Sequence, residues 1–169
     1  MLSHSTHITT WAVALLGLFA KSTGAVNLTY YAPEASVDPA FANWIGSFYQ
    51  AAEATNTTAA GYSAFFDAHS TIELAGWNPS QDVKDGLMVR EHFPTTVSID
   101  GDYPIEKKFH LYGLTKAHYK NSTCAVESYE TKFTILKNDG SCNLEPEAKS
   151  LVNLELIEQT PSSVSCDSF

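Results

Sequence analysis

The chain has little cysteine. Only Cys124, Cys142 and Cys166 occur among 169 residues, which is too few for the disulfide scaffold that small secreted domains use in place of a core. A chain of this length buries enough surface for one ordinary hydrophobic core. The cysteine content therefore excludes a knottin-like protein and allows one intramolecular disulfide.

Positive charge is also scarce. Ten Lys and Arg stand against nineteen Asp and Glu, and the formal net charge is −9. Nucleic acids and anionic membranes attract basic surfaces, so we expect neither as a partner.

The sequence lacks the motifs of cofactor enzymes. It contains no Gly-x-Ser-x-Gly elbow, phosphate loop or dinucleotide fingerprint, and no His-x-His or Cys-x-x-Cys spacing. His110 and His118 stand eight residues apart on one expected strand, roughly 26 Å at the usual rise, which is too far for a shared metal ion. We therefore expect no metal and no other cofactor.

One apolar run stands at the amino terminus. Residues 11–20 are uncharged and apolar, too short to cross a bilayer, and are followed by small residues up to Ala25. This pattern predicts a signal peptide over residues 1–25 and a secreted, extracellular protein; the alternative is a buried apolar helix. Removal of the leader takes away Lys21 and no acidic residue, which moves the formal charge to −10.

Three Asn-x-Ser/Thr triplets follow the expected cleavage site. They begin at Asn27, Asn56 and Asn121, each beside polar or turn-forming residues. In a chain that enters the secretory pathway, such triplets predict N-glycosylation.

The first half of the domain reads as helix, helix, strand, helix. Asp38-Pro39 is typical of a helix start, and apolar residues recur at helical spacing to about Ala54. Shorter patterns predict a helix carrying Tyr62, a strand over residues 70–75, and a helix over residues 85–92 that ends before Pro94.

The second half changes to long strands. Residues 104–119, 122–137 and 142–158 are rich in aromatic and β-branched side chains, and Asp139-Gly140 is a strong hairpin signal. We expect an α+β fold in which a cone-shaped, curved antiparallel sheet wraps over an N-terminal helical layer, in the order α-α-β-α-β-β-β. The expected domain spans residues 38–159, between an arm (26–37) and a tail (160–169).

This pattern of elements resembles the nuclear transport factor 2-like superfamily, and within it the SnoaL-like branch. The resemblance rests on Asp38-Pro39 with Trp44-Ile45 and Phe48-Tyr49, then Tyr62 with residues 65–73, then residues 86–89 before the long strands. It implies a barrel with an internal pocket, often dimeric through the outer sheet face. The superfamily includes ketosteroid isomerase, scytalone dehydratase, limonene-epoxide hydrolase and polyketide cyclases, and the secreted form is similar to fungal members of unassigned function.

Candidate pocket residues follow from the expected strand pairing. A two-residue turn at Asp139-Gly140 would place Tyr129 opposite Ser150, and a similar turn near Asn121 would place Tyr112 beside Tyr129. One largely apolar face would then carry the polar side chains of His110, Tyr112, Glu127 and Tyr129.

In such a pocket, His110 or Glu127 would act as general acid or base, while Tyr112 and Tyr129 donate hydrogen bonds to a substrate oxygen. The alternative is a satisfied hydrogen-bond network or a ligand-binding lining without chemistry. Asp67 and His69, at the expected pocket mouth, are further candidates; Asp67 otherwise ends a helix and His69 lies on the surface.

The catalytic patterns of ketosteroid isomerase and limonene-epoxide hydrolase are absent, and only the residue types of scytalone dehydratase are similar. Three functions remain: a pocket that binds a small apolar molecule, which we favour, a cofactor-independent lyase, isomerase or cyclase, and an extracellular protein-interaction domain.

The expected hairpin separates Cys124 from Cys142, and places Cys124 near Glu155, from which the tail could turn back. We therefore predict a Cys124–Cys166 disulfide; the alternatives are that Cys166 pairs with Cys142 or stays free.

Overall fold

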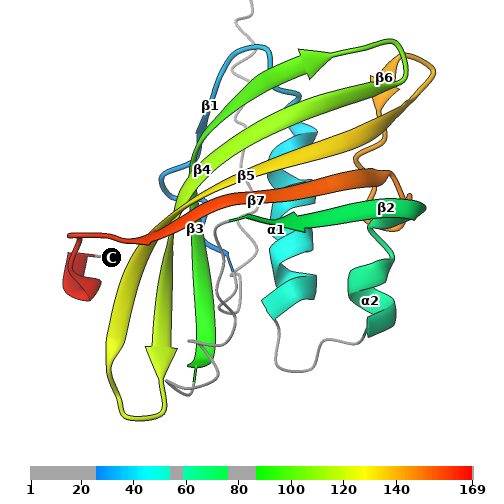
Figure 1. Ribbon diagram of the computed structural model, residues 1–169. Coiled ribbons are helices and arrows are strands. Elements are labelled where there is room, and N and C mark those ends of the chain that lie inside the picture. Colours follow the sequence, from blue (N-terminus) through cyan, green and yellow to red (C-terminus); the bar gives the residue numbers. More distant parts are fainter. Residues whose placement is uncertain (1–25, 54–58, 76–86, 169) are drawn as a thin grey trace, which may run out of the picture.

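The computed structural model describes residues 26–53, 59–75 and 87–168. The predicted leader, Asn56 and the start of the predicted helix at residues 85–92 lie outside these residues. The described chain is a mixed α+β structure with a large curved sheet and few helices (Figure 1). None of its helices is long and apolar enough to span a membrane.

Helix α1 (Ala40–Glu53) begins where the sequence predicts. The side chain of Asp38 accepts a hydrogen bond from the Ala40 amide at 2.9 Å, and Pro39 occupies the first turn, where no amide hydrogen is needed. A shorter helix, α2 (Ala59–Ser63), follows it.

The strands form one unclosed sheet with the order β1-β3-β4-β5-β7-β2. Its long members are β2 (Phe66–Leu74), β3 (Leu87–Asp102), β4 (Glu106–Tyr119), β5 (Cys124–Asn138) and β7 (Leu151–Pro161). The short strands are β1 (Ala32–Pro33), beside β3, and β6 (Ser141–Cys142), which pairs with β5. β1–β3 and β2–β7 are parallel pairs, so the expectation of a purely antiparallel sheet was wrong.

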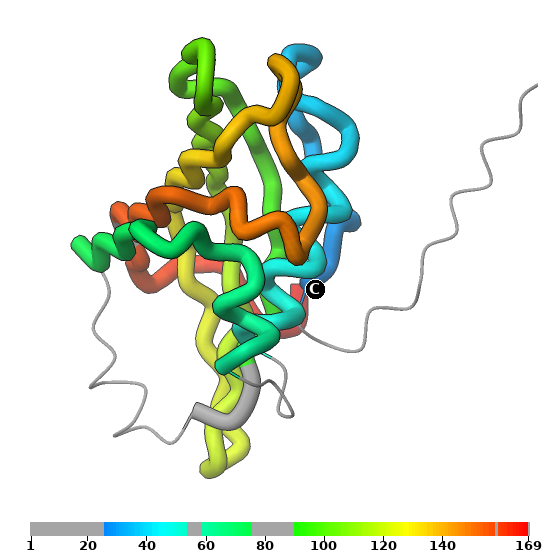
Figure 2. Tube along the Cα trace, turned by 90° about the vertical axis from the view of Figure 1, so that its right-hand side faces the viewer, coloured from blue at the N-terminus to red at the C-terminus, as the bar shows by residue number. Residues whose placement is uncertain are grey.

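Aromatic side chains hold α1 against the sheet. Phe41 stacks on Phe109 of β4 with ring centroids 4.1 Å apart, and Trp44 and Phe48 meet Phe133 of β5 edge to face. All five rings are almost fully buried. Burial of each such ring stabilises the fold by about 1.5–3 kcal/mol, so this layer contributes substantially to stability. Figure 2 shows the sheet curving around the helical side of the molecule.

The helix predicted before Pro94 is a strand instead. β3 begins at Leu87 and continues through Pro94, where the pairing with β4 shifts between Pro94 and Val97. A proline has no amide hydrogen for a ladder, and such an irregularity accommodates it within a strand. The apolar run from Leu87 was too short to distinguish the two structures.

The last predicted strand is divided. Asp139 and Gly140, both with positive φ, form the expected turn, and Asn138 pairs with Ser141 as predicted. Residues 143–150, which include Pro146, then leave the sheet, and β7 starts at Leu151 opposite Ile135. The expected pairing of Tyr129 with Ser150 is therefore wrong, because Tyr129 pairs with Gln159.

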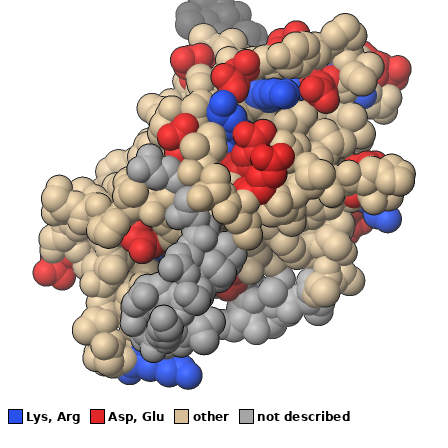
Figure 3. Space-filling model, in the orientation of Figure 1, with Lys and Arg blue, Asp and Glu red and all other residues tan. Residues whose placement is uncertain are grey.

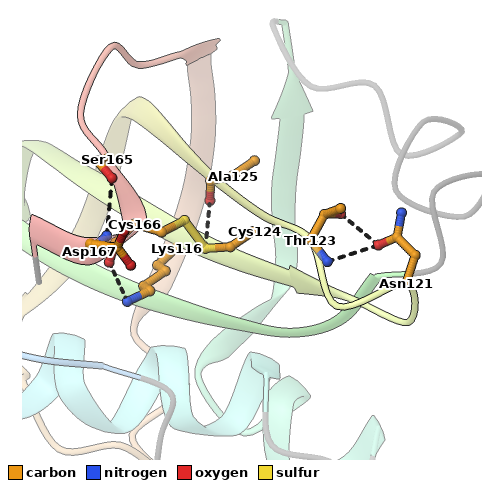
Figure 4. The surroundings of a disulfide bond; sticks show 8 residues. All are labelled: Lys116, Asn121, Thr123, Cys124, Ala125, Ser165, Cys166 and Asp167. Carbon is orange, nitrogen blue, oxygen red and sulfur yellow. Dashed lines mark hydrogen bonds between the residues drawn. A yellow bond between two sulfur atoms is a disulfide. The ribbon is translucent and has the colours of Figure 1, made fainter.

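The predicted disulfide is present. Cys124, at the start of β5, is bonded to Cys166 in the short 3-10 helix η1 (Cys166–Ser168), with a Cα–Cα distance of 6.3 Å (Figure 4). The Lys116 side chain donates a hydrogen bond to the Cys166 carbonyl at 2.7 Å. The expected position of Cys124 near Glu155 was wrong: Glu155 pairs with Lys132, and β7 runs on to Pro161 before the tail reaches Cys124.

Candidate functional site

A cavity of about 340 Å³ lies between the end of α1 and the face of the sheet that α1 covers. Its volume is at the lower end of the range for small-molecule sites. Apolar side chains make much of the wall: Phe48, Ala52, Ile72, Leu74, Phe133, Leu154 and Leu156. The other lining residues carry polar groups: Tyr49, Glu53, Tyr62, Arg90, His92, Thr115, Tyr129, Thr131 and Gln159.

The cavity has an exposed border at strand β2. Ile72 and Leu74 line it, yet these side chains are 50% and 47% exposed. β2 is the last strand of the sheet on this side. A ligand can therefore contact apolar groups at the edge of the sheet and reach buried polar groups farther in.

Glu53, His92 and Arg90 form a charged cluster in the cavity wall. His92 Nε2 lies 3.1 Å from Glu53 Oε1, and Arg90 Nη1 lies 3.9 Å from the same oxygen. Glu53 closes helix α1, whereas Arg90 and His92 stand two residues apart on β3. Alternation along a strand places Arg90 and His92 on one face, where both meet the end of the helix.

The cluster fixes the protonation of His92. Burial lowers the pKa of His92, which favours the neutral ring. Burial alone would raise the pKa of Glu53, but the hydrogen bond from His92 and the charges nearby lower it. An ionised carboxylate can only accept, so Nε2 of the neutral ring carries the hydrogen and Nδ1 keeps its lone pair.

Aromatic rings hold the imidazole in position. Tyr49 stacks on His92 with centroids 3.9 Å apart and planes at 11°, and Tyr129 meets it edge-on at 5.4 Å. Burial raises the pKa of Tyr49 and Tyr129 above the usual range, so both hydroxyls stay protonated at neutral pH. The imidazole is thus a positioned base that contacts two neutral tyrosines, in addition to the charged groups of Glu53 and Arg90.

Several buried polar atoms of the wall are incompletely hydrogen-bonded. His92 Nδ1 and the Thr115 hydroxyl have no hydrogen-bond partner among the described residues. The hydroxyls of Tyr129 and Thr131 lie beside that of Tyr49, but neither completes a hydrogen bond of normal distance and angle within the described structure. Buried groups without partners are uncommon in folded proteins, and a ligand is one way to satisfy them.

A glycine makes room for Tyr129. Gly113 of β4 pairs with Tyr129 of β5, and a Cβ at position 113 would lie 2.6 Å from the Tyr129 ring. The ring therefore lies across the glycine, where any side chain would collide with it. This contact keeps Tyr129 against the sheet and in the cavity wall.

Two predicted site residues lie on the opposite face. Tyr112 pairs with Glu130 and does not lie beside Tyr129, and His110 pairs with Lys132, so neither side chain is on the face of Tyr129, where both were expected. The turn between β4 and β5 is longer than two residues: His118 pairs with Cys124, and Tyr119 closes the loop onto Thr123. A shift of one residue moves every side chain to the other face, which is why the expected grouping was wrong.

The outer face of the sheet is a network of paired charges. His110 lies 2.7 Å from Glu130, Lys132 is paired with Asp100 at 2.8 Å, and Tyr112 is 42% exposed. Figure 3 shows acidic side chains gathered over this side of the sheet with a few basic ones among them.

The other candidates are dispersed. Tyr129 lines the cavity, whereas Glu127, although on the same face, accepts a hydrogen bond from Gln159 and is not part of the lining. Asp67 accepts a hydrogen bond from the His69 amide at 2.9 Å at the start of β2, and His69 is exposed. Neither of these two lines the cavity.

The sequence reasoning missed Glu53, Arg90 and His92. The helix expected over residues 85–92 hid the pair on β3, and no site residue was predicted at the end of the helix that was expected to reach about Ala54. The available signal was the apolar–polar alternation of Val97, Ser98, Ile99 and Asp100 just beyond Pro94, which is a strand pattern.

The Asn-x-Thr triplets at Asn27 and Asn121 share one conformation. In both, the asparagine side chain accepts hydrogen bonds from the amide and the hydroxyl of the threonine two residues on, at 3.0 and 2.6 Å. Asn121 is exposed and Asn27 is half-buried.

Within residues 26–53, 59–75 and 87–168, no group of three or more His, Cys, Asp or Glu side chains could hold a metal ion. Comparison with protein-family models, with curated proteins and with solved structures found no match to this chain.

Proposed function

We propose that this protein is a secreted glycoprotein that binds a small, largely apolar molecule in the cavity between α1 and the sheet. One observation carries the proposal: the cavity has an apolar, aromatic wall in which a few polar atoms converge and lack partners in the described structure. This is the composition that a small-molecule site needs, because apolar area provides affinity and polar groups provide orientation.

Other features support the setting and the family. A disulfide between Cys124 and Cys166 fits an oxidising compartment, as secretion after removal of residues 1–25 requires. Membership of the nuclear transport factor 2-like superfamily, in its SnoaL-like branch, remains part of the proposal. What supports it is coarser: a large curved sheet, with the antiparallel run β3-β4-β5-β7, that packs against helix α1. The dimer that this resemblance implies would use the outer face.

A neutral fluorescent dye such as Nile red tests the site. We expect one dye molecule to bind per chain with increased emission. Ala52→Trp should fill the cavity and reduce the affinity at least tenfold, because Ala52 lines it at the end of α1. Asn43→Trp is the matched control, since Asn43 is exposed on the same helix. Equal binding by both variants would place the dye elsewhere and contradict the proposal.

A second function, cofactor-independent isomerase or lyase, is favoured by the His92–Glu53 pair. A neutral imidazole, held by a carboxylate and stacked on Tyr49, is the arrangement of a general base. Nδ1 would take a proton from a carbon beside a carbonyl group, and the electrons of that bond would form an enolate. A hydroxyl of the wall would donate to the enolate oxygen, and the imidazolium would return the proton to a second carbon.

One substitution distinguishes the proposed catalytic function from binding alone. His92→Gln should abolish turnover of any substrate while a bound apolar molecule is retained, since most of the wall is unchanged. If His92→Gln keeps full turnover, His92 is not a catalytic residue.

A further inference from the structure

We propose that the cavity selects neutral, ring-shaped molecules that carry a hydroxyl group, and that this hydroxyl donates its hydrogen to Nδ1 of His92. The inference rests on the proposed function, because it names the class of ligand that the same cavity takes. It is argued from hydrogen-bonding capacity, from charge and from the shape of the wall.

The hydrogen-bonding capacity of His92 selects a donor. Its Nε2 is engaged with Glu53 at 3.1 Å, and its Nδ1 is buried without a partner in the described part of the chain. Because the carboxylate requires the hydrogen on Nε2, Nδ1 can only accept. An ether or a ketone oxygen cannot satisfy it, whereas a hydroxyl can. The Thr115 hydroxyl, also without a described partner, can donate to the oxygen of the same group.

The charges of the wall select a neutral ligand. The carboxylate of Glu53 and the guanidinium of Arg90 lie 3.9 Å apart and offset each other. Their side chains are only 23% and 8% exposed. An anionic ligand would bring an uncompensated charge beside Glu53, and leaving water for such a place is costly.

The shape of the wall selects a ring. Phe48, Tyr49, Tyr62, Tyr129 and Phe133 all contribute rings to it. Aromatic rings pack best against other rings, either stacked or edge to face. A cavity of about 340 Å³ has room for a fused bicyclic molecule.

Three probes that share one skeleton test the inference on the unmodified protein. 2-Naphthol has the ring and a donor, 2-methoxynaphthalene keeps the ring and the oxygen without the donor, and 2-naphthoate adds a negative charge. Fluorescence titration near pH 7 should show 2-naphthol binding about tenfold more tightly than 2-methoxynaphthalene, the usual effect of one hydrogen bond to a buried partner. 2-Naphthoate should bind at least tenfold more weakly than 2-naphthol.

Each other outcome is informative. Equal affinity for the two neutral probes would overturn the inference and leave apolar binding in the cavity intact. The same holds if 2-naphthoate binds best. If none of the three binds with one molecule per chain, both the inference and the proposed function fail.

Substitutions locate the preference. His92→Phe keeps a ring on Tyr49 but removes both nitrogens, so the two neutral probes should bind within about twofold of each other. His110→Phe is the matched control on the outer face and should keep the tenfold preference. A preference that survives His92→Phe would contradict the inference, whereas the probe comparison on the unmodified protein stands without any variant.

Discussion

The two faces of the sheet carry the same pair of residue types with different surroundings. On the outer face, His110 lies 2.7 Å from Glu130, beside an exposed Tyr112 and a second ion pair. On the face under α1, His92 lies 3.1 Å from Glu53, stacked on Tyr49 and beside a cavity. The pairs differ little in distance. What distinguishes them is the environment, because only His92 keeps a buried ring nitrogen without a described partner.

This comparison shows why residue type alone does not identify a site. The histidine and the glutamate on the outer face have side chains that are 14% and 23% exposed, close to the 9% and 23% of the pair in the cavity wall, so burial of the pair does not identify a site either. The same two types in the cavity wall combine a fixed tautomer, a buried ring nitrogen without a described partner, and contact with an apolar space. The following substitutions test the difference between the faces, from the largest expected effect to the smallest.

Neighbouring residues of β5 should differ most in stability. Phe133 is fully buried against Trp44 and Phe48, whereas Lys132 lies on the outer face and pairs with Asp100. We expect Phe133→Ala to lower the free energy of unfolding by about 3–5 kcal/mol, from lost burial and the space left behind. Lys132→Ala should cost less than about 1 kcal/mol. Urea denaturation measures both, and similar losses would contradict the assignment of the faces.

Two glycines give a sharper comparison. A Cβ at Gly113 or at Gly101 would lie 2.6 Å from a tyrosine ring, Tyr129 in the first case and Tyr103 in the second. Tyr129 is 4% exposed and held in the cavity wall, whereas Tyr103 is 48% exposed and free to move aside. Gly113→Ala should therefore cost about 1–3 kcal/mol.

Gly101→Ala should change the stability by no more than about 0.5 kcal/mol. Thermal unfolding of the two variants under one condition makes the comparison. If Gly101→Ala lowers the thermal stability more than Gly113→Ala does, the Tyr129 ring is not fixed in the cavity wall.

The pH dependence of stability should carry the signature of His92. Its pKa is lowered in the folded state by burial, so below about pH 6.5 the unfolded chain binds more protons than the folded one. The contribution of His92 to the free energy of unfolding is therefore fully present above about pH 6.5. It is lost as the pH falls toward the lower pKa that His92 has in the folded state. The facing groups are Glu53 and Tyr49 of α1, Arg90 of β3 and Tyr129 of β5.

His92→Gln should flatten the curve of unfolding free energy against pH in the range just below about pH 6.5. One proton corresponds to at most about 1.4 kcal/mol per pH unit. Glu53, whose pKa is also lowered, acts below its ordinary value of 4.5 and leaves that window unaffected. Identical curves for the variant and the unmodified protein would show that His92 is not a neutral buried base.

Local signals in the sequence predicted the local structure well. Asp38-Pro39 marked the start of α1, Asp139-Gly140 marked the β5–β6 turn, and the Cys124–Cys166 pairing is present. The helix start and the turn each depend on a few adjacent residues, and the disulfide depends on how far the C-terminal tail can extend. The alternating pattern also identified β4 and β5 to within two residues.

The composition of the site could not be predicted, because it depends on pairing between strands. One additional residue in the β4–β5 turn moved His110 and Tyr112 to the outer face, and no local pattern reports that difference. A short apolar run at Leu87 fits a helix or a strand equally well, so Arg90 and His92 were not recognised as neighbours. Of the polar side chains predicted for the site, only Tyr129 is found in the wall.

The most direct test of the account asks which face a ligand touches. Protein with labelled Thr, Ile and Leu methyl groups would be mixed with 2-naphthol, and NMR would record nuclear Overhauser effects between ligand protons and methyl groups. We predict effects to Thr131, Leu154 and Ile72, which line the cavity. Leu114 lies two residues from Tyr112 on β4 and therefore on the same outer face. Nuclear Overhauser effects to Leu114 would contradict the central claim that the cavity under α1 is the binding site.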